Sequence, residues 1–585
     1  MKRYWKYVKP YLPAFIIGPI LMIVEVIGEV VMPLLLSNII DKGVNGGRSI
    51  SYIIMMGVAM VITAFIMMAG GTGGAFFAIK ASSGFANDLR KDLFNKIQKF
   101  SFANIDRYST GSLVTRLTND VTMIQDMIQM MLRMALRAPG MFIGALIMAF
   151  SLNPKLATVI MCIIPILAFT IYCIIKTGFP RFEAMQKKLD ALNTATQENL
   201  TNIRVVKSFI REKYEEEKFK RANTDLKDST IHALKVVIFA IPVVTLAMNV
   251  TTLAVVWFGG RQVIAGSMTT GILTAFVNYV VQILMSLMMV SMIILNSSRV
   301  LASIKRINEV FNTDIDLTDE HASRKDLTVA HGKVEFRNVC FKYYKNNAKW
   351  VLENINLVIN PGETVGIIGS TGSGKSSLVQ LIPRLYDADQ GEVLVDDVNV
   401  KDYSLKNLRD GVGIVLQKNV LFSGTIKENL KWGNEDADDE LVCKFAESAQ
   451  AHGFISSFKD GYETELGQGG TNVSGGQKQR LCIARALLKK PKILILDDST
   501  SAVDTATEAK IRESLRNELK NTTKIIIAQR ISSVIEADKI VVIDDGKITG
   551  IGTHEELMRD CEAYKEIYYS QMDKEHPQMN KEVTA

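Results

Sequence analysis

The stretch Thr364–Gln380, TVGIIGSTGSGKSSLVQ, decides the fold of this chain. Val365–Ile368 is predicted to be a buried β-strand, a glycine-rich turn follows it, and a helix is predicted to begin near Lys375. The turn matches G-x-x-x-x-G-K-[ST], a pattern in which backbone N–H groups and a helix N-terminus face a polyphosphate. A flexible glycine loop is the alternative, but the strand before the turn and the helix after it favour phosphate binding. The stretch therefore predicts a nucleoside triphosphate site in an α/β domain.

The residues of this turn have separate predicted roles. Lys375 is expected to reach the β- and γ-phosphates, and the Ser376 hydroxyl to coordinate Mg²⁺. The predicted ATP-binding residues of the turn are Gly369, Ser370, Thr371, Gly372, Ser373, Gly374, Lys375, Ser376 and Ser377. A second stretch, Pro491–Asp504 (PKILILDDSTSAVD), is a predicted buried strand that ends in two carboxylates. It is expected to deliver Asp497 to the Mg²⁺ beside Ser376.

The composition divides the chain into two unlike parts. Of 585 residues, 48% are hydrophobic, and the apolar excess lies before residue 300. The mean hydropathy of +0.14 is high for a soluble protein of this size. The net charge of +7 is interpreted through the positive-inside rule, because basic patches interleaved with aromatic residues, typical of nucleic-acid binding, are not evident. The six cysteines are scattered without C-x-x-C, so neither a metal site nor a disulfide framework is expected.

The first half of the chain is predicted to cross a membrane six times. Each crossing of a hydrocarbon core takes about 20 helical residues. The predicted spans are Ala14–Ile40, Tyr52–Ile79, Arg137–Leu152, Leu156–Ile175, Val236–Trp257 and Ile272–Leu295, the third beginning upstream near Met127. Two links, Lys80–Asp126 and Thr177–Lys235, are long, charged and helical in pattern, which places them with the basic N-terminus on the cytoplasmic side.

After the membrane half, short β-rich runs alternate with helical ones, as in a nucleotide-binding α/β domain. The predicted organisation is a membrane α-helical bundle of six spans with long cytosolic helical extensions, followed by an α/β P-loop domain. The expected boundaries are 1–310 for the membrane domain, 311–332 for a linker, 333–572 for the nucleotide-binding domain and 573–585 for a polar tail.

A third motif, Asn472–Arg480 (NVSGGQKQR), gives the chain its resemblance to a known family. VSGGQ matches the signature of the ATP-binding cassette (ABC) family. Together with the phosphate loop and the spans, it makes residues from about 10 to 572 resemble an exporter half-transporter of the multidrug and lipid-export type. The resemblance implies ATP and Mg²⁺ as cofactors. It also implies that two cassettes pair head-to-tail, so that each signature closes the ATP held by the other cassette.

The resemblance assigns further roles. Ser474, Gly475, Gly476 and Gln477 are the signature residues expected to act on a partner's ATP. Gln417, in VLQKN, resembles the Q-loop glutamine that also contacts Mg²⁺, Asp504 belongs to the D-loop, and Tyr343 resembles the aromatic that stacks on adenine. Coupling helices are expected near Ser101–Tyr108 and Ser208–Lys213, with a solvated charged helix as the alternative.

Three positions depart from the family pattern. Asp498 stands where the family has the Glu that polarises the attacking water, Gln529 replaces the switch His, and Gln468 replaces a Glu before the signature. Asp is shorter than Glu by one C–C bond of about 1.5 Å, and a misplacement near 1 Å costs on the order of 10²-fold in rate. Gln can bond a γ-phosphate but has no titratable ring. Tolerated drift is the alternative to the prediction that this site binds ATP well and hydrolyses it poorly, as in the degenerate-site half of a heterodimeric exporter.

The membrane half offers fewer indications of substrate. Glu25 and Glu29 lie one helical turn apart, and Arg133 and Arg137 repeat that spacing. Burying an ionised carboxylate in lipid is costly, so Glu25 and Glu29 are expected to face a cavity or a protein partner. Either cation binding or structural pairing explains them. Met285, Met288, Met289 and Met292 form a stripe suited to promiscuous ligands or to plain helix packing. The predicted substrate cavity comprises Glu25, Glu29, Arg133, Arg137 and Met289.

Together with these patterns, the family resemblance implies ATP-driven efflux of amphipathic or hydrophobic compounds of the multidrug type across the cell membrane. The cassette is expected in the cytoplasm, and the expected partners are the bilayer, a small amphipathic substrate and a second half-transporter. The alternatives are an exporter of a defined lipid or peptide, an ATP-gated regulatory subunit and a low-turnover homodimer.

Overall fold

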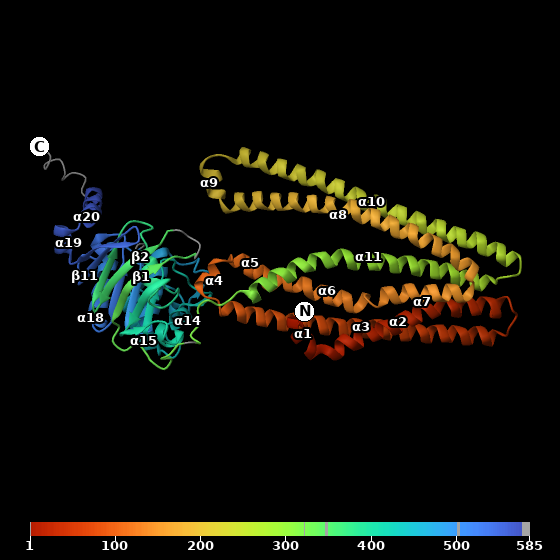
Figure 1. Cartoon of the computed structure of the whole chain (residues 1–585), viewed down its shortest axis with the longest axis horizontal. Coiled ribbons are helices and arrows are strands. Elements are labelled where there is room, and N and C mark those ends of the chain that lie inside the picture. The colour runs from red at the N-terminus through yellow and green to blue at the C-terminus, as the bar shows by residue number, and fades with distance from the viewer. Residues whose placement is uncertain (1, 321, 345–348, 500–502, 576–585) are drawn as a thin grey trace. The chain divides into compact units, whose positions relative to one another are not determined.

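The computed structural model describes all residues except 1, 321, 345–348, 500–502 and 576–585 (Figure 1). The chain forms two compact units, Met1–Gln98 with Thr110–Asn312, and Lys99–Ser109 with Thr313–Ala585. The segment Lys99–Ser109 lies inside the predicted membrane domain 1–310 but belongs to the second unit. Of the predicted polar tail, residues 576–585 lie outside the described residues, and residues 573–575 end the last helix.

The first unit is helical throughout. Its α-helices are α1 (Lys2–Val8), α2 (Leu12–Asn38), α3 (Ile50–Gln98), α5 (Thr110–Thr115), α6 (Val121–Met134), α7 (Arg137–Leu152), α8 (Pro154–Thr201), α9 (Ile203–Ser208), α10 (Glu212–Ile264) and α11 (Thr270–Asn312). A 3₁₀ turn, η1 (Lys9–Tyr11), and two π-helical segments, η2 (Ile39–Val44) and η3 (Arg116–Asp120), join them.

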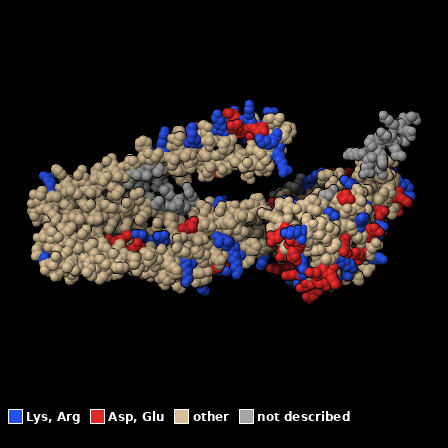
Figure 2. All heavy atoms as spheres, turned by 180° about the vertical axis from the view of Figure 1, so that it is seen from behind, with Lys and Arg blue, Asp and Glu red and all other residues tan. Residues whose placement is uncertain are grey.

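The lengths and apolar character of these helices suit a membrane. In the described residues, four helical segments are long and apolar enough to cross one, namely Arg3–Val44, Ile50–Gln98, Thr110–Leu152 and Thr270–Val290. The remaining two predicted spans lie within the continuous helices α8 and α10, which is consistent with six crossings. On the face shown in Figure 2, the end of this unit away from α9 is covered almost wholly by uncharged residues.

Helices α2 and α3 pack closely because glycines line their contact. A Cβ on Gly74 of α3 would lie 3.1 Å from the carbonyl oxygen of Gly18 and 2.4 Å from the Met22 side chain. Small residues let helix backbones approach in this way in membranes. The close packing fixes where the polar side chains of α2 lie.

Helices α8 and α10 form a separate hairpin. They run side by side and part from α11 toward their connection at α9 (Figure 1). At the other end, Leu156, Ile160 and Val255 share a buried core with Tyr279 and Ile283 of α11. The short helix expected near Ser208–Lys213 is α9, so it lies several residues upstream of the predicted position.

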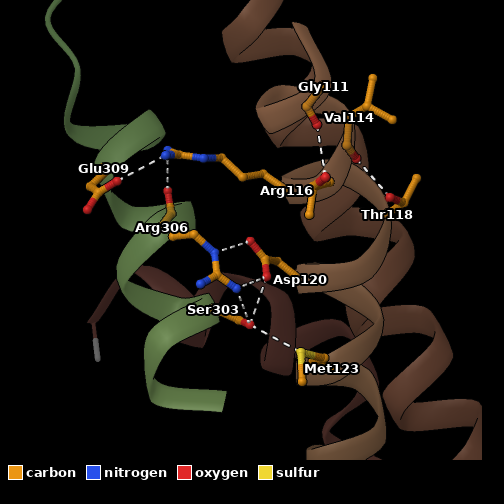
Figure 3. Close-up of polar contacts among 10 residues, drawn as sticks. Gly111, Val114, Arg116, Thr118, Asp120, Met123, Ser303, Arg306 and Glu309 are labelled. Atoms are coloured by element: carbon orange, nitrogen blue, oxygen red, sulfur yellow. Dashed lines mark hydrogen bonds and ion pairs between the residues drawn. The ribbon is translucent and has the colours of Figure 1, made fainter. Parts of the chain in front are cut away.

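A buried polar network joins α11 to η3 (Figure 3). Asp120, which is 1% exposed, accepts hydrogen bonds from both Arg306, at 2.8 Å from Nε, and Ser303, at 2.8 Å. Arg116 donates to the Arg306 carbonyl at 2.8 Å and to Glu309 at 3.1 Å. Charge-assisted bonds of this kind are the stronger ones in proteins. They fix the end of α11 that leads into the second unit.

The second unit is an α/β domain. Its strands are β1 (Val334–Phe341), β2 (Leu352–Ile359), β3 (Thr364–Ile368), β4 (Gln390–Val395), β5 (Val398–Asn399), β6 (Val412–Val415), β7 (Gly424–Thr425), β8 (Glu465–Leu466), β9 (Ile493–Asp497), β10 (Thr523–Ile527), β11 (Lys539–Asp544) and β12 (Lys547–Gly552). The main sheet has the order β12-β11-β3-β10-β9-β6, with only β12 antiparallel, and a second sheet has the antiparallel order β2-β1-β4-β5.

Helices surround these sheets. They are α4 (Phe102–Asp106), α12 (Lys375–Gln380), α13 (Leu405–Gly411), α14 (Ile426–Lys431), α15 (Asp439–Ser448), α16 (His452–Ser457), α17 (Gly475–Leu488), α18 (Thr505–Glu518), α19 (His554–Asp560) and α20 (Glu562–Glu575). The sequence predicts a membrane helical bundle followed by an α/β P-loop domain, and the structure has a bundle of long apolar helices followed by an α/β domain, as predicted.

Candidate functional site

The phosphate loop lies between β3 and α12, and its glycines are there for steric reasons. A Cβ on Gly369 would lie 2.0 Å from the carbonyl oxygen of Ile543, so this position excludes any side chain. Gly372 and Gly374 have φ angles of 86° and 100°, which favour glycine. Strand β11, which carries Ile543 and pairs with β3 in the sheet, thus limits the space that the loop can occupy.

The ammonium group of Lys375 is held against this loop. It donates to the carbonyl oxygens of Gly369 at 2.8 Å and of Ser370 at 2.7 Å. Burial lowers the pKa of Lys375, and the carboxylates of Asp497 and Asp498 oppose that shift. A cation and the N-terminus of α12 therefore lie at one glycine-rich loop, a combination that favours the binding of polyphosphates.

Asp497 and Ser376 form the candidate magnesium site. Asp497 ends β9 and is 2% exposed, and the Ser376 hydroxyl donates to its Oδ1 at 2.9 Å. Burial raises the pKa of Asp497, and the bond from Ser376 opposes the shift. A hydroxyl and a carboxylate are oxygen ligands of the type that Mg²⁺ takes, so these residues fit the ion.

The two departures from the family pattern meet beside this site. Gln529 follows β10, and its Nε2 donates to Oδ2 of Asp498 at 2.7 Å. Asp498 has a φ of 48° directly after β9, where β9 and β10 are paired in parallel. Burial raises the pKa of Asp498, whereas hydrogen bonds from Gln529 and Gln417 act in the opposite direction. The carboxylate at the position predicted for hydrolysis is thus bonded by the Gln529 amide.

Tyr343 contacts α12, the helix that follows the phosphate loop. Its hydroxyl and the Ser377 hydroxyl share a hydrogen bond of 2.8 Å. Its ring meets Phe341 edge-on at a centroid distance of 5.0 Å and Tyr386 edge-on at 5.2 Å. The residue is 37% exposed, so its neighbours do not cover it fully, and its stacking on adenine stays a prediction.

Tyr386 is a residue of this region that no sequence motif indicates. Its hydroxyl donates to Asp106 of α4 at 2.7 Å, and its ring lies edge-on to Phe102 at 6.0 Å. Burial, and then the bond to Asp106, raise the pKa of Tyr386 above its usual range. Tyr386 thus connects the coupling helix expected near Ser101–Tyr108, which is α4, with Tyr343 and the phosphate loop. An aromatic residue shortly after the phosphate-loop helix was the one signal in the sequence.

The signature residues lie on a different element from the phosphate loop. Ser474 caps α17: its hydroxyl accepts from the Gln477 N–H at 3.3 Å, while its own N–H donates to Gln477 Oε1 at 2.8 Å. Ser474 and Gly475 are exposed. Asp504 caps α18 by accepting from the Thr507 N–H at 2.9 Å, and Ser501, in the same D-loop motif, lies outside the described residues. An exposed, capped helix end can meet a second molecule.

In the membrane unit the structure brings three of the predicted cavity residues together. Arg137 Nη2 lies 2.5 Å from Glu29 Oε1 and 3.2 Å from Glu25 Oε1. Arg133 lies in the last turn of α6 and is separated from Arg137 by a break in the helix at residues 135–136. Met289 packs against the buried core around Tyr279, whereas Met285 lines a pocket with Glu29. The Met292 side chain lies outside the described residues.

Comparisons with known proteins agree with this architecture. Residues 15–287 match the family model of the ABC transporter transmembrane region, and residues 352–501 match the family model described as ABC transporter. An uncharacterized ABC transporter ATP-binding protein of Bacillus subtilis, YfiB, is 40% identical over 98% of this chain and 99% of its own length. YgaD of the same organism, provisionally named a multidrug export ATP-binding/permease protein, is 34% identical over 97% of this chain and 98% of its own.

A solved structure is similar over nearly the whole chain. The structure of a bacterial Atm1-family ABC exporter with ATP bound superposes with a TM-score of 0.78 and 25% sequence identity, covering 96% of this chain and 98% of that one.

Proposed function

The chain belongs to the ABC transporter family, as an exporter half-transporter that carries its transmembrane region and its ATPase domain in one polypeptide, and from this premise we propose a division of labour between two chains. In this proposal the protein exports amphipathic compounds from the cytoplasm as one half of a heterodimer. Its own phosphate loop holds ATP for long periods, and hydrolysis takes place at the partner's site. The observation that carries the proposal is the Asp498–Gln529 pair in an otherwise complete ATP site.

ATP binding at this chain's own site is supported by the groups gathered there. Lys375, the glycine-shaped loop and the N-terminus of α12 supply positive potential, and Tyr343 offers a partly exposed ring. Mg²⁺, when bound, neutralises phosphate charge, and Ser376, Asp497 and Gln417 would hold it.

Poor hydrolysis at this site is supported by the chemistry of the pair. The Asp498 carboxylate is already bonded by the Gln529 amide, and its side chain is one carbon shorter than that of Glu. Gln529 has no ring nitrogen that could exchange a proton near neutral pH. Positioning and charge stabilisation supply most of the catalysis of phosphoryl transfer. A carboxylate that is shorter and already bonded to Gln529 should therefore lower the rate of hydrolysis strongly.

The partner's site is proposed to depend on Ser474–Gln477 of this chain. These residues lie at the exposed, N-terminally capped end of α17, where N–H groups can face an anion. Closure of two cassettes over ATP would then move α4, which is bonded to Tyr386. Export of diverse compounds, rather than of one lipid or peptide, is supported by a methionine-rich membrane pocket and by the name of one relative.

The test is to measure ATPase activity of the purified chain alone and together with a co-expressed second half-transporter. The proposal predicts little activity alone and robust activity in the pair. Robust ATPase from this chain alone would contradict the heterodimer and would favour a homodimer with two equivalent sites.

A further inference from the structure

A pocket in the membrane unit lies among α2, α3, α7 and α11. Its volume is about 370 Å³, within the range of about 300–1,000 Å³ that small-molecule sites occupy. Glu29 of α2 and Gln282 of α11 are polar residues of its lining. Because the four helices are separate in sequence, the pocket exists only in the folded bundle.

The apolar lining of this pocket is dominated by methionine. One such residue comes from α2, two from α3, one from α7 and one from α11: Met32, Met60, Met67, Met141 and Met285. Methionine is unbranched and polarizable, so it adapts to irregular and varied apolar ligands. The lining is therefore suited to the apolar part of an amphipathic molecule.

The charges beside the pocket are unequal. Both ion pairs of Glu25 and Glu29 in the described chain are with the same group, Arg137, at 3.2 Å and 2.5 Å. Two carboxylates thus share one guanidinium. Arg133, beyond the break between α6 and α7, acts on Glu25 only through its longer-range field.

Hydrogen-bond acceptors exceed donors at the same place. Glu25 Oε2, Glu29 Oε2 and Gln282 Oε1 are buried and accept no hydrogen bond from the described residues, against one unpartnered donor atom, Arg137 Nε. Gln282 uses its amide N–H to bond the Glu29 carbonyl at 2.8 Å, which leaves its oxygen as the acceptor. A ligand that brings positive charge or N–H donors complements this set, because unpaired buried acceptors are costly.

We propose that this pocket binds amphipathic monocations, with Glu29 facing the cationic group while Glu25 retains Arg137. The step rests on the proposed export function and names its substrate class. Glu25 is already 3.2 Å from the guanidinium, so Arg137 remains paired when Glu29 turns to a ligand. Glu25 has room for this role because α3 presents Gly71 there: a Cβ at that position would lie 3.1 Å from both carboxylate oxygens. When Glu29 turns from Arg137 to the ligand, no buried charge is left without a partner. This is the condition for such a change of partner inside a membrane.

The test compares a cation with a neutral compound of similar shape. Tetraphenylphosphonium and triphenylphosphine oxide are bound at equilibrium to the full chain in lipid nanodiscs without ATP. Glu29→Gln is expected to lower the affinity for the cation by about tenfold, the loss of one close charge interaction, and to leave the affinity for the neutral compound unchanged. Glu25→Gln is expected to act in the same direction, because Arg137 is then held by Glu29 alone. Glu183→Gln, an exposed carboxylate on α8, is the matched control and should change neither affinity.

The remaining outcomes decide the proposal. Met285→Ala should weaken the binding of both compounds, since it removes part of the apolar lining of the pocket. Equal loss of both compounds in Glu29→Gln, with ATP binding to the cassette intact, assigns the carboxylate a structural role and overturns the site. Unchanged cation affinity in Glu29→Gln overturns it as well. Charge-selective binding without ATP-dependent transport supports the pocket while refuting the efflux function, and transport without charge-selective binding here refutes the pocket alone.

Discussion

The side-chain amide of Gln529 donates a hydrogen bond of 2.7 Å to the carboxylate of Asp498. The two residues follow β10 and β9, which pair in parallel, so the sheet itself sets them side by side. By the family resemblance, each replaces a residue that is expected to take part in hydrolysis, and the two side chains bond each other. The pair is therefore a single structural unit, and substitutions there are expected to be non-additive.

Restoring both family residues should restore hydrolysis at this chain's own site. In a heterodimer whose partner site is disabled by Ser474→Ala, Asp498→Glu with Gln529→His is expected to raise ATPase activity on the order of 10²-fold, because the carboxylate regains its reach. Either single change should recover much less. Steady-state phosphate release is the measurement, and adding Lys375→Ala should abolish the gain. No increase in the double variant would show that another feature limits this site.

The raised pKa of Asp498 has a consequence for stability. Because burial disfavours its charged form, the ionised carboxylate destabilises the fold at neutral pH. Asp498→Asn keeps an acceptor for Gln529 and should raise the thermal unfolding midpoint of the cassette at pH 7. That gain should shrink as the pH falls through the raised pKa, where the native carboxyl is protonated. A gain that is independent of pH, or absent, contradicts the assignment of burial as the cause.

Local patterns predicted much of the second unit. The phosphate loop, β3 and β9 are contiguous in sequence, so an apolar run and a glycine motif suffice to place them. The two-residue strands β5, β7 and β8, and β12 with its two glycines, were not predicted, because such short or glycine-containing segments form only against their partners.

Tertiary contacts explain what the sequence could not show. Nothing local connects Tyr386 with Asp106, or Gln282 with Glu29, because each pair joins distant segments. The break after α6 likewise separates Arg133 from Arg137, although their spacing suggests one continuous helix face. The sequence does predict that the Glu25 and Glu29 side chains lie close together, because one continuous helix, α2, carries both residues one turn apart.

Because Tyr386 bonds Asp106 of α4, we predict that Tyr386 couples ATP hydrolysis to transport. Tyr386→Phe keeps the ring contact with Tyr343 but loses the 2.7 Å bond to α4. Basal ATPase of the heterodimer should stay close to wild type, whereas its stimulation by a transported compound should fall. Tyr403→Phe is the matched control, since it loses a buried 3.0 Å bond to the Val395 carbonyl elsewhere in the cassette. Equal losses of stimulation in both variants would indicate general destabilisation instead of coupling.

Asp396 is predicted to be a stability determinant of the cassette. With a φ of 50°, it accepts four backbone N–H bonds of 2.7–2.9 Å from residues 330–333. Asp396→Ala should lower the free energy of unfolding of the cassette by about 3 kcal/mol, since bonds to a charged acceptor are lost. Its neighbour Asp397 also has positive φ but forms one exposed ion pair with Lys333, so Asp397→Ala should cost about 1 kcal/mol or less. Urea unfolding followed by fluorescence would compare them, and equal costs would contradict the role of the four bonds.

Two substitutions of Ser474 can distinguish its role in the signature from its role as a helix cap. Its hydroxyl both caps α17 and belongs to the signature proposed to act on the partner's ATP. Ser474→Ala removes the cap at a cost of about 1 kcal/mol, whereas Ser474→Gly removes the hydroxyl at a cost of only a few tenths. Both variants are expected to abolish turnover of the heterodimer while ATP still binds at this chain's own phosphate loop, measured with a fluorescent ATP analogue. Loss in Ser474→Ala alone would attribute the effect to capping. If both variants keep turnover, and Asp498→Glu accelerates the chain without any partner, the protein is a slow homodimer and the asymmetric mechanism is wrong.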